Sequence, residues 1–289
     1  MRKERTIHIT ETPRDAMQGI PGFISTETKA EYQNLLLKCG FDCLDAGSFV
    51  SPKAIPQMAD TAAVLGLLNT SGTNIMVIAG NEKGCLQAAR HEKVATVGFP
   101  YSVSPTFLQR NINSTPEKAY GTIDKMLDIT HLNNKNLLVY LGMAFGNPYG
   151  DEWNTGLLLS ETEKLHRKGL RDIALSDITA EASPDRIFEV CNLLQKTFGD
   201  IRFRLHLHIL PGEGHPKIDA AVSAGIRYFE SAIGGAGGCP MTGYKMVSNL
   251  NTADLLTYCN INGYDTSIDP GFFTLAVAMA GKIFSKPTK

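Results

Sequence analysis

The sequence predicts a single-domain (β/α)₈ barrel that ends in an extra closing helix. Three observations support this fold class. Short β-branched or apolar runs alternate with longer amphipathic segments, eight short runs can be counted, and the 289 residues show no composition break that would separate two domains. Barrels of this kind often form one domain of about 250 residues. A doubly wound open sheet shares the strand–helix alternation and is the alternative.

The eight short runs are the predicted barrel strands, since each is rich in apolar or β-branched residues and is too short for a helix. In chain order they are Thr6–Thr12, Phe41–Phe49, Asn74–Gly80, Val94–Ser102, Asn136–Phe145, Asp172–Thr179, Arg202–Leu210 and Arg227–Gly235.

Between these runs lie segments with apolar residues at helical spacing and with Ser, Thr or Pro near their starts. They include Glu27–Cys39, Thr115–Leu127, Leu158–Lys168, Pro184–Thr197 and His215–Ala224. Gly40, Gly169 and Gly225 stand just ahead of the next strand, where a glycine commonly ends a helix.

The chain after the eighth strand is predicted to be helical from Asp254 to Phe284. The cap-like sequence Asp269-Pro270-Gly271 predicts the start of a further helix that closes the barrel. The barrel should therefore occupy residues 6–255 approximately, with a helical segment over about 256–286, both within one domain over 1–289.

Composition excludes several classes of protein. The hydrophobic fraction of 43% is too high for a disordered chain, and a formal net charge of −1 argues against a nucleic-acid binder. No apolar run approaches the roughly 20 residues that span a bilayer, and no apolar segment follows the charged N-terminus as a secretory signal would require. Six cysteines are too sparse for a disulfide scaffold, so we expect reduced thiols and a cytoplasmic protein.

The segment from Arg202 to Ile209 carries the strongest functional pattern. Arg202, Arg204, His206 and His208 alternate with apolar residues, so on a strand the four polar side chains share one face. In a barrel that face points into the lumen, where unpaired polar groups are costly. Two imidazoles at positions i and i+2 can reach one metal ion; the alternative is a pair of hydrogen-bonded core histidines. Arg204, lower on this face, is expected to pair with a carboxylate such as Glu230.

Further ligands must come from other strand ends, because function in such barrels lies at the carboxyl ends of the strands. Asp15, Asp45, Asp177 and Asn249 all stand at or after predicted strand ends. Two nitrogen ligands with carboxylate and amide oxygens suit a six-coordinate Mg²⁺, Mn²⁺ or Co²⁺. Taken singly, each aspartate would be read as a helix cap or a loop residue.

An ordered set of motifs resembles the hydroxymethylglutaryl-CoA lyases, metal-dependent barrels that are themselves similar to the isopropylmalate and citramalate synthases. The resemblance runs from about Thr6 to Leu255. Its pieces are Pro13-Arg14-Asp15 with Gln18, Asp45-Ala46-Gly47-Ser48-Phe49-Val50-Ser51-Pro52-Lys53, Asn81-Glu82-Lys83-Gly84, Asn111-Ile112-Asn113, Ser176-Asp177, His206-Leu207-His208, Gly237-Gly238-Cys239-Pro240 and Asn249. The Ser-Phe-Val-Ser-Pro-Lys run and the Gly-Gly-Cys-Pro loop favour the lyases over the synthases.

The resemblance implies a metal site and a catalytic set. It implies metal ligation by Asp15, His206, His208 and Asn249, a substrate-binding and charge-stabilising role for Arg14, and a catalytic role for Cys239. We also expect Gln18 to bind substrate and Asp45 and Asp177 to join the catalytic residues. The metal is expected to be Mg²⁺ or Mn²⁺, the substrate an acyl-CoA, and the assembly a homodimer.

The chain departs from the family at three positions that bear on the substrate. Asp45 stands where these lyases usually carry Glu, Ile209 where they usually carry Asp, and Asn147 where they usually carry Cys. These departures leave the implied metal ligands in place and bear on the pocket for the acyl chain.

The implied reaction cleaves 3-hydroxy-3-methylglutaryl-CoA into acetyl-CoA and acetoacetate, as in leucine degradation. A metal can acidify the substrate hydroxyl, Asp45 or His206 can act as base, and Arg14 can stabilise the thioester oxygen. Cys239 can protonate the departing carbanion, with the neighbouring glycines letting its loop close over substrate. The alternatives are a related lyase or aldolase that acts on another 3-hydroxyacyl-CoA or a 2-oxo acid, and a non-catalytic metal- or CoA-binding barrel.

Overall fold

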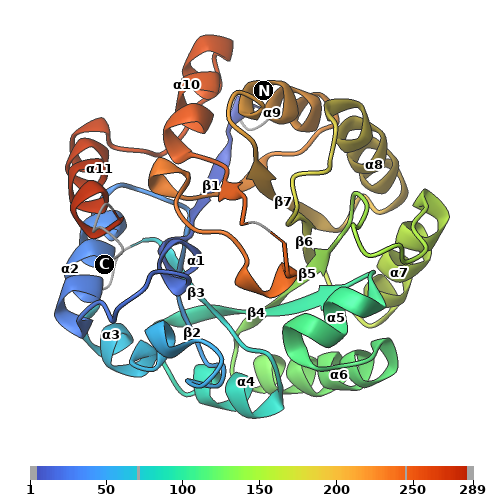
Figure 1. Ribbon diagram of the computed structural model, residues 1–289, viewed down its shortest axis with the longest axis horizontal. Coiled ribbons are helices and arrows are strands. Elements are labelled where there is room, and N and C mark those ends of the chain that lie inside the picture. Colours follow the sequence, from blue (N-terminus) through green and yellow to red (C-terminus); the bar gives the residue numbers. More distant parts are fainter. Residues whose placement is uncertain (1–4, 70–71, 245, 285–289) are drawn as a thin grey trace.

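The computed structural model describes residues 5–69, 72–244 and 246–284, and in it eight parallel strands close into a barrel (Figure 1). The pairing order runs β6-β5-β4-β3-β2-β1-β8-β7, and a β6–β7 pairing closes the ring. The predicted barrel is therefore confirmed, and the open-sheet alternative is wrong. The strands are β1 (His8–Glu11), β2 (Cys43–Ser48), β3 (Asn74–Ile78), β4 (Val94–Ser102), β5 (Asn136–Gly142), β6 (Asp172–Asp177), β7 (Arg202–Ile209) and β8 (Tyr228–Ser231).

Helices surround the strands as a ring, seen from the end in Figure 1, while the short α1 lies inside that ring. They are α1 (Pro13–Gln18), α2 (Thr26–Lys38), α3 (Thr61–Leu67), α4 (Glu82–Ala89), α5 (Pro105–Ile112), α6 (Pro116–Leu132), α7 (Thr155–Arg167), α8 (Pro184–Thr197), α9 (Gly214–Ser223), α10 (Thr252–Asn262) and α11 (Pro270–Phe284). Among the described residues, no helix is both long and apolar enough to cross a membrane.

The C-terminal segment forms two helices rather than one. Gly263, with a φ of 69°, ends α10, and the Asp269 carboxylate caps α11 by accepting hydrogen bonds from the backbone N–H groups of Gly271 and Phe272 at 2.8 and 2.9 Å. The predicted start of the closing helix is thus confirmed, and α11 packs on α2. Residues 285 and 286 of the predicted segment lie outside the described residues.

The core has two parts that together fix where a site can form. The large part lies between the strands and the helices, and a small apolar cluster fills the lumen: Cys43, Met76, Ile78, Leu138, Tyr140 and Ala174. Below that cluster Arg204 is held by Asp172, with Nε–Oδ1 and Nη2–Oδ2 distances of 2.7 and 2.6 Å. The expected pairing of Arg204 with Glu230 is therefore wrong. With the lower lumen filled, space remains at the carboxyl ends of the strands.

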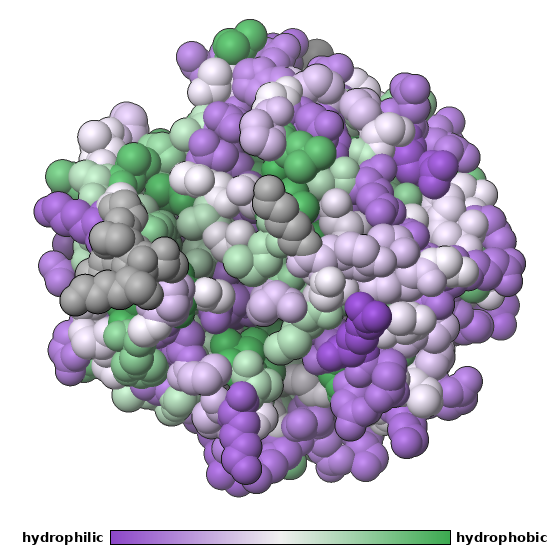
Figure 2. Space-filling model, in the orientation of Figure 1, coloured by the Kyte–Doolittle hydropathy of each residue, from purple (hydrophilic) through white to green (hydrophobic). Residues whose placement is uncertain are grey.

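The face at the carboxyl ends is partly apolar. In the space-filling view, hydrophobic residues lie around its middle and beside α2 and α11, while hydrophilic residues dominate the rim (Figure 2). The segment after β8 crosses this face towards the end of β5 (Figure 1).

Candidate active site

Three potential metal ligands meet at the carboxyl end of the barrel. Asp15 comes from α1, directly after β1, and His206 and His208 come from the lumen face of β7. One ligand atom from each residue lies within 4.8 Å of the other two, and all three residues are buried. The two Nε2 atoms are 3.3 Å apart. Two imidazole lone pairs that face each other at this distance repel unless a proton or a cation lies between them.

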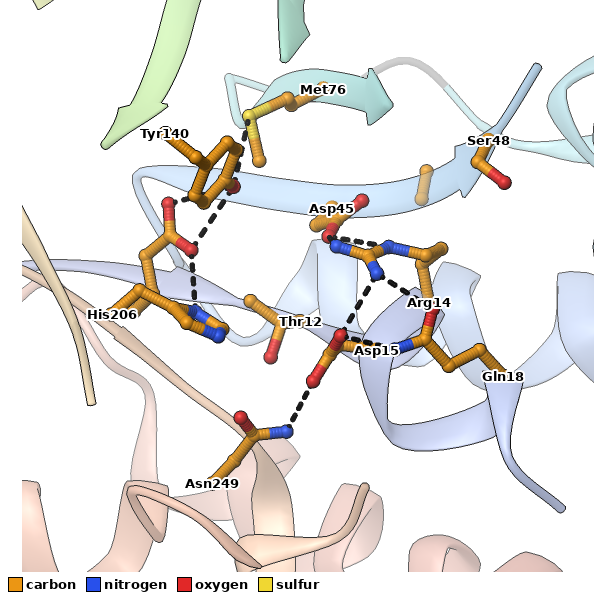
Figure 3. Close-up of polar contacts among 12 residues, drawn as sticks. Thr12, Arg14, Asp15, Gln18, Asp45, Ser48, Met76, Tyr140, His206 and Asn249 are labelled. Carbon is orange, nitrogen blue, oxygen red and sulfur yellow. Dashed lines mark hydrogen bonds and ion pairs between the residues drawn. The ribbon is translucent and has the colours of Figure 1, made fainter. Parts of the chain in front are cut away.

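Asn249 completes the group through a short additional strand. β9 (Ser248–Asn249) pairs antiparallel with the end of β7, which places Asn249 opposite His208. Its Nδ2 donates to Asp15 Oδ2 at 2.6 Å (Figure 3) and also to the Ala236 carbonyl at 2.8 Å. Its Oδ1 is buried without a hydrogen-bond partner among the described residues. A carbonyl oxygen without a donor, next to a carboxylate and two imidazoles, fits a bound divalent cation.

A buried carboxylate stands behind the first histidine. Glu230 Oε2 lies 3.0 Å from His206 Nδ1, and the Tyr140 hydroxyl donates to both Glu230 oxygens at 3.0 and 3.1 Å (Figure 3). Burial alone would lower the pKa of His206, but the hydrogen bond and the charge of Glu230 outweigh it and raise that pKa. The contact also fixes the ring so that Nε2 faces His208, as partner carboxylates of metal-binding histidines do.

The second histidine is held neutral. Burial, followed by the neighbouring charge of His206, lowers the pKa of His208 to about 3. The pKa of Asp15 is also lowered, because the charge of Arg14, followed by that of His206, outweighs its burial. A neutral imidazole and an ionised carboxylate are the forms that bind a cation.

Arg14 connects the metal-ligand group to a further carboxylate. Its Nε and Nη2 both donate to Asp45 Oδ2, while Nη1 donates to Asp15 Oδ1 at 2.9 Å and to Gln18 Oε1 at 3.0 Å. Gln18 in turn donates to Asp15 Oδ1 at 2.7 Å. Burial raises the pKa of Asp45 to about 6 against the opposing charge of Arg14. The side chains of Asp15, Gln18 and Asp45 thereby hold the guanidinium in one position.

These groups border a cavity of about 150 Å³ that is mostly apolar elsewhere. Its polar lining includes Arg14, Asp15, Gln18, Tyr101, Asn111, Tyr140, Ser176, His206 and His208. Asp45 is not among the described residues that line it. An apolar cavity with few polar groups at one end is typical of a small-molecule site.

The loop after β8 covers this cavity with Cys239, Pro240 and Met241. Gly237, with a φ of 98°, lies against α1, where an added Cβ would come within 2.6 Å of the Asp15 carbonyl oxygen, so only glycine fits. Burial raises the pKa of Cys239 to about 12, which keeps the thiol protonated at neutral pH. The cavity is therefore bordered by a thiol in its protonated form.

The loop is held from the opposite wall. The Thr242 carbonyl accepts hydrogen bonds from Arg110 Nη1 at 3.0 Å and from the Tyr149 hydroxyl at 2.8 Å. The Arg110 guanidinium also lies 4.9 Å from the centroid of the Tyr149 ring. Nothing in the sequence pattern marked these two residues, because the contact depends on how far the loop reaches across the barrel.

The structure does not bring Asp177 to this group. Its carboxylate accepts the backbone N–H groups of Thr179, Glu181 and Ala182, at 3.4, 3.2 and 2.9 Å, and so shapes the loop after β6. Alternation along the strand turns the preceding residue, Ser176, to the cavity instead.

Two of the positions that depart from the family pattern also lie away from the polar group. Asn147 organises the loop after β5, where its Oδ1 accepts the backbone N–H groups of Tyr149 and Asp151 at 3.0 and 3.1 Å. Ile209 is buried and pairs with Ser248 of β9. Of the three departures, Asp45 is therefore the one that contacts a residue of this polar group, namely Arg14.

Comparisons with known proteins agree with this geometry. Over 258 residues the chain is 27% identical to the mitochondrial hydroxymethylglutaryl-CoA lyase of Macaca fascicularis, covering 89% of this chain and 79% of the relative. It is also 27% identical over 267 residues to the (R)-citramalyl-CoA lyase of Chloroflexus aurantiacus, covering 89% and 84%.

Solved structures are similar over nearly the whole chain. An HMG-CoA lyase from Acinetobacter baumannii, in complex with coenzyme A and 3-methylmalate, is 26% identical with a TM-score of 0.91, covering 99% of this chain and 93% of that one. The HMG-CoA lyase of Pseudomonas aeruginosa is 25% identical with a TM-score of 0.88, covering 98% and 94%. The HMGL-like family model matches residues 6–269, so this chain belongs to the HMGL-like family and is a lyase.

Proposed function

We propose that this lyase cleaves 3-hydroxy-3-methylglutaryl-CoA into acetyl-CoA and acetoacetate with a bound Mg²⁺ or Mn²⁺. The observation that supports this most strongly is that Arg14, Cys239 and the cation-binding group of Asp15, His206 and His208 border one cavity. The A. baumannii relative, whose structure contains coenzyme A, supports an acyl-CoA substrate. A cytoplasmic location and a homodimer stay predictions.

Cleavage breaks the bond between C2 and C3 of the acyl group. The hydroxyl on C3 loses its proton and becomes the ketone of acetoacetate, while the electron pair of the broken bond passes to C2 of the departing acetyl-CoA. Asp15, His206, His208 and Asn249 would hold a divalent cation, and its positive charge would lower the pKa of that hydroxyl. Side chains of this protein carry out the remaining steps of the reaction.

Arg14 and Cys239 serve the departing group. Negative charge moves onto the thioester oxygen as the bond breaks, and the fixed Arg14 guanidinium stabilises it by hydrogen bonding. The Cys239 thiol, protonated because burial raises its pKa to about 12, then delivers a proton to C2. Gln18 positions Arg14 and lines the same cavity.

Of the two expected bases, His206 borders the cavity and Asp45 does not. We therefore assign Asp45 to holding Arg14 and keep His206 as the candidate base. Because its Nδ1 faces Glu230, its Nε2 can hold the cation or take up the proton of the substrate hydroxyl, but not both at once. Because His206 also belongs to the ligand set, a His206→Gln variant separates the roles. Its amide oxygen can bind a cation but cannot take up a proton, so retained Mn²⁺ affinity with lost turnover supports the base role.

A product assay tests the proposal directly. The purified protein is stripped with EDTA, and acetyl-CoA and acetoacetate are measured before and after Mg²⁺ or Mn²⁺ is restored. We expect activity only with metal, and an Arg14→Ala variant serves as the inactive control. Absence of products with every metal tried would contradict the proposal.

A second substrate is favoured by two observations. The similarity to an (R)-citramalyl-CoA lyase is as strong in identity as that to the hydroxymethylglutaryl-CoA lyases, and Asp45 is one methylene shorter than the usual Glu. In a panel of both thioesters, a higher kcat/KM for the shorter acyl chain, with release of a 2-oxo acid, would assign the protein to this alternative.

A further inference from the structure

Ser176 occupies a position in the cavity wall that the reaction above does not use. It lies at the end of β6, where its Cα pairs in register with His206 of β7 on one side and Gly142 of β5 on the other. It is 1% exposed and lines the cavity. At this level of the cavity wall, β7 therefore presents an imidazole, β6 a hydroxyl and β5 a glycine without a side chain.

The Ser176 hydroxyl has no hydrogen-bond partner among the described residues. Two other buried serines at this end of the barrel do have one, whereas Ser48, which does not line the cavity, has none. Ser102 Oγ donates to the Gly142 carbonyl at 3.0 Å, and Ser231 Oγ is 2.9 Å from Thr252 Oγ1. An unpaired buried hydroxyl lowers the stability of a fold, so a partner supplied by a ligand accounts best for a serine here.

The surroundings of the Ser176 hydroxyl leave room for an atom of a bound ligand and hold the hydroxyl in a fixed position. Gly142 presents no side chain beside it, and an added Cβ there would come within 3.2 Å of the Tyr101 carbonyl oxygen. On the next position of β6, the Asp177 carboxylate ties down the following loop through three backbone N–H groups. Ser176 is thus held at the end of a fixed strand with open volume in front of it.

The place of this wall in the cavity indicates which part of a substrate meets it. The thioester end must lie by Arg14 and by Cys239 at the mouth, and the carbinol carbon by the histidines. The remaining arm of the acyl chain then extends along β5 and β6, where the other lining groups include the apolar Ile178. A hydroxyl donor bonds most strongly to a charged acceptor.

We propose that Ser176 Oγ donates a hydrogen bond to a carboxylate at the far end of the acyl chain, and so selects dicarboxylic acyl-CoA substrates over those that end in a methyl group. This inference rests on the proposed acyl-CoA lyase function and names the residue that binds the end of the acyl chain.

Two matched thioesters test the proposal: 3-hydroxyglutaryl-CoA and 3-hydroxybutyryl-CoA, which differ by the terminal carboxylate. Both are titrated calorimetrically into Mn²⁺-loaded protein that carries Cys239→Ala to prevent turnover. Adding Ser176→Ala should weaken binding of 3-hydroxyglutaryl-CoA by about ten- to a hundredfold, the usual range for a hydrogen bond to a charged group. Binding of 3-hydroxybutyryl-CoA should change less than about twofold.

Ser48→Ala is the matched control. Its hydroxyl is also buried without a partner among the described residues, but Ser48 lies at the end of β2, apart from the polar contacts and outside the cavity lining (Figure 3). We expect both affinities to stay unchanged. Thermal unfolding of Ser176→Ala should show a Tm equal to or above that of its parent, because the lost hydroxyl makes no contact within the fold.

The outcomes separate the two proposals. Equal weakening of both thioesters by Ser176→Ala, or of neither, overturns the role of Ser176 and leaves the acyl-CoA function standing. A parent protein that binds neither thioester overturns the acyl-CoA function, and the role of Ser176 with it. A lowered Tm with equal weakening assigns Ser176 to the fold alone.

Discussion

Arg14 and Asp45 form an ion pair in which Nε and Nη2 of the guanidinium both donate to the same carboxylate oxygen, Oδ2, at 2.9 and 2.6 Å. The other oxygen, Oδ1, is buried and has no partner among the described residues. Asp45 is fully buried, so the pair is shielded from solvent. Because Asp45 accepts two of the four hydrogen bonds that hold the guanidinium, loss of its charge should loosen Arg14 in the position that faces the cavity.

Asp45→Asn should therefore impair catalysis without touching Arg14. The amide keeps the size of the side chain but loses the charge that holds the guanidinium, and hydrogen bonds to charged groups contribute about 1.5–3 kcal/mol. We expect kcat/KM to fall about ten- to a hundredfold, measured by acetyl-CoA release. Unchanged kcat/KM would show that Asp15 and Gln18 suffice to hold Arg14.

His208→Ala should remove most of the affinity for a divalent cation. The nitrogen that faces His206 is lost, and since even outer partners of metal ligands change affinity about 10–100-fold, a ligand should change it at least that much. Titration calorimetry with Mn²⁺ measures the effect. His166→Ala is the control, because that imidazole pairs with Asp200 on the surface. Equal affinity in both variants would exclude His208 from the ligands.

Cys239 should stay unreactive towards iodoacetamide well above neutral pH. An ordinary thiol ionises near pH 8.5, whereas burial raises the pKa of Cys239 to about 12. Since the thiolate is the reactive form, the inactivation rate should remain low through pH 9 and rise only beyond it. The Cys239→Ser variant, which lacks this thiol, gives the background rate at which iodoacetamide modifies other residues. A rate that rises with a midpoint near 8.5 would contradict the protonated thiol on which the donor role depends.

Tyr149→Phe should loosen the loop that carries Cys239. The variant loses the hydroxyl that donates to the Thr242 carbonyl and keeps the ring beneath Arg110. We expect faster hydrogen exchange over residues 236–244 and faster alkylation of Cys239, with a Tm within a few degrees of the parent. Tyr264→Phe, whose ring lies by Arg227 just ahead of β8 and by Tyr258 of α10, should change neither. Unaltered exchange would show that Arg110 alone holds the loop.

How much of the site could be predicted depends on strand register. Alternation along Arg202–Ile209 placed both histidines on the lumen face, and the strand ends placed Asp15 and Asn249 near them. The partners of that face were not predictable, because Glu230 stands opposite His206 across β7 and β8, while Arg204 extends the other way to Asp172. That pairing follows from the closure of the barrel, which the sequence does not encode locally.

The same limit explains Asp177 and Ser176. Neighbouring residues of a strand point to opposite faces, so Ser176 and Asp177 cannot both face the cavity from β6, and position at a strand end does not tell which of them does. The position of Asp177 at the predicted end of the sixth strand makes it a site candidate. The strand places the serine in the cavity and leaves the aspartate to the loop.

Glu11 should make the stability of the fold depend on pH. Burial raises the pKa of Glu11 to about 8, against weaker opposing hydrogen bonds from Thr252 and the backbone of Ile233. Between about pH 4.5 and 8 the folded chain therefore holds a proton that the unfolded chain has released. The stability contributed by that proton is complete below pH 4.5, falls as pH rises through this window and is lost above pH 8.

Glu11→Gln removes the titrating group, so its free energy of unfolding should change less between pH 5 and 8 than that of the parent, by a few kcal/mol at most. Urea unfolding at pH 5, 6.5 and 8 measures the difference. Glu82→Gln, at an exposed ion pair, should keep the parent's dependence. If the free energy of unfolding depended on pH equally in the parent and in Glu11→Gln, a group other than Glu11 would cause the dependence. Ionisation of Glu11 should also disturb the candidate active site. Glu11 forms hydrogen bonds with Ile233 and Thr252, the residues on either side of the segment that carries Cys239 and Asn249.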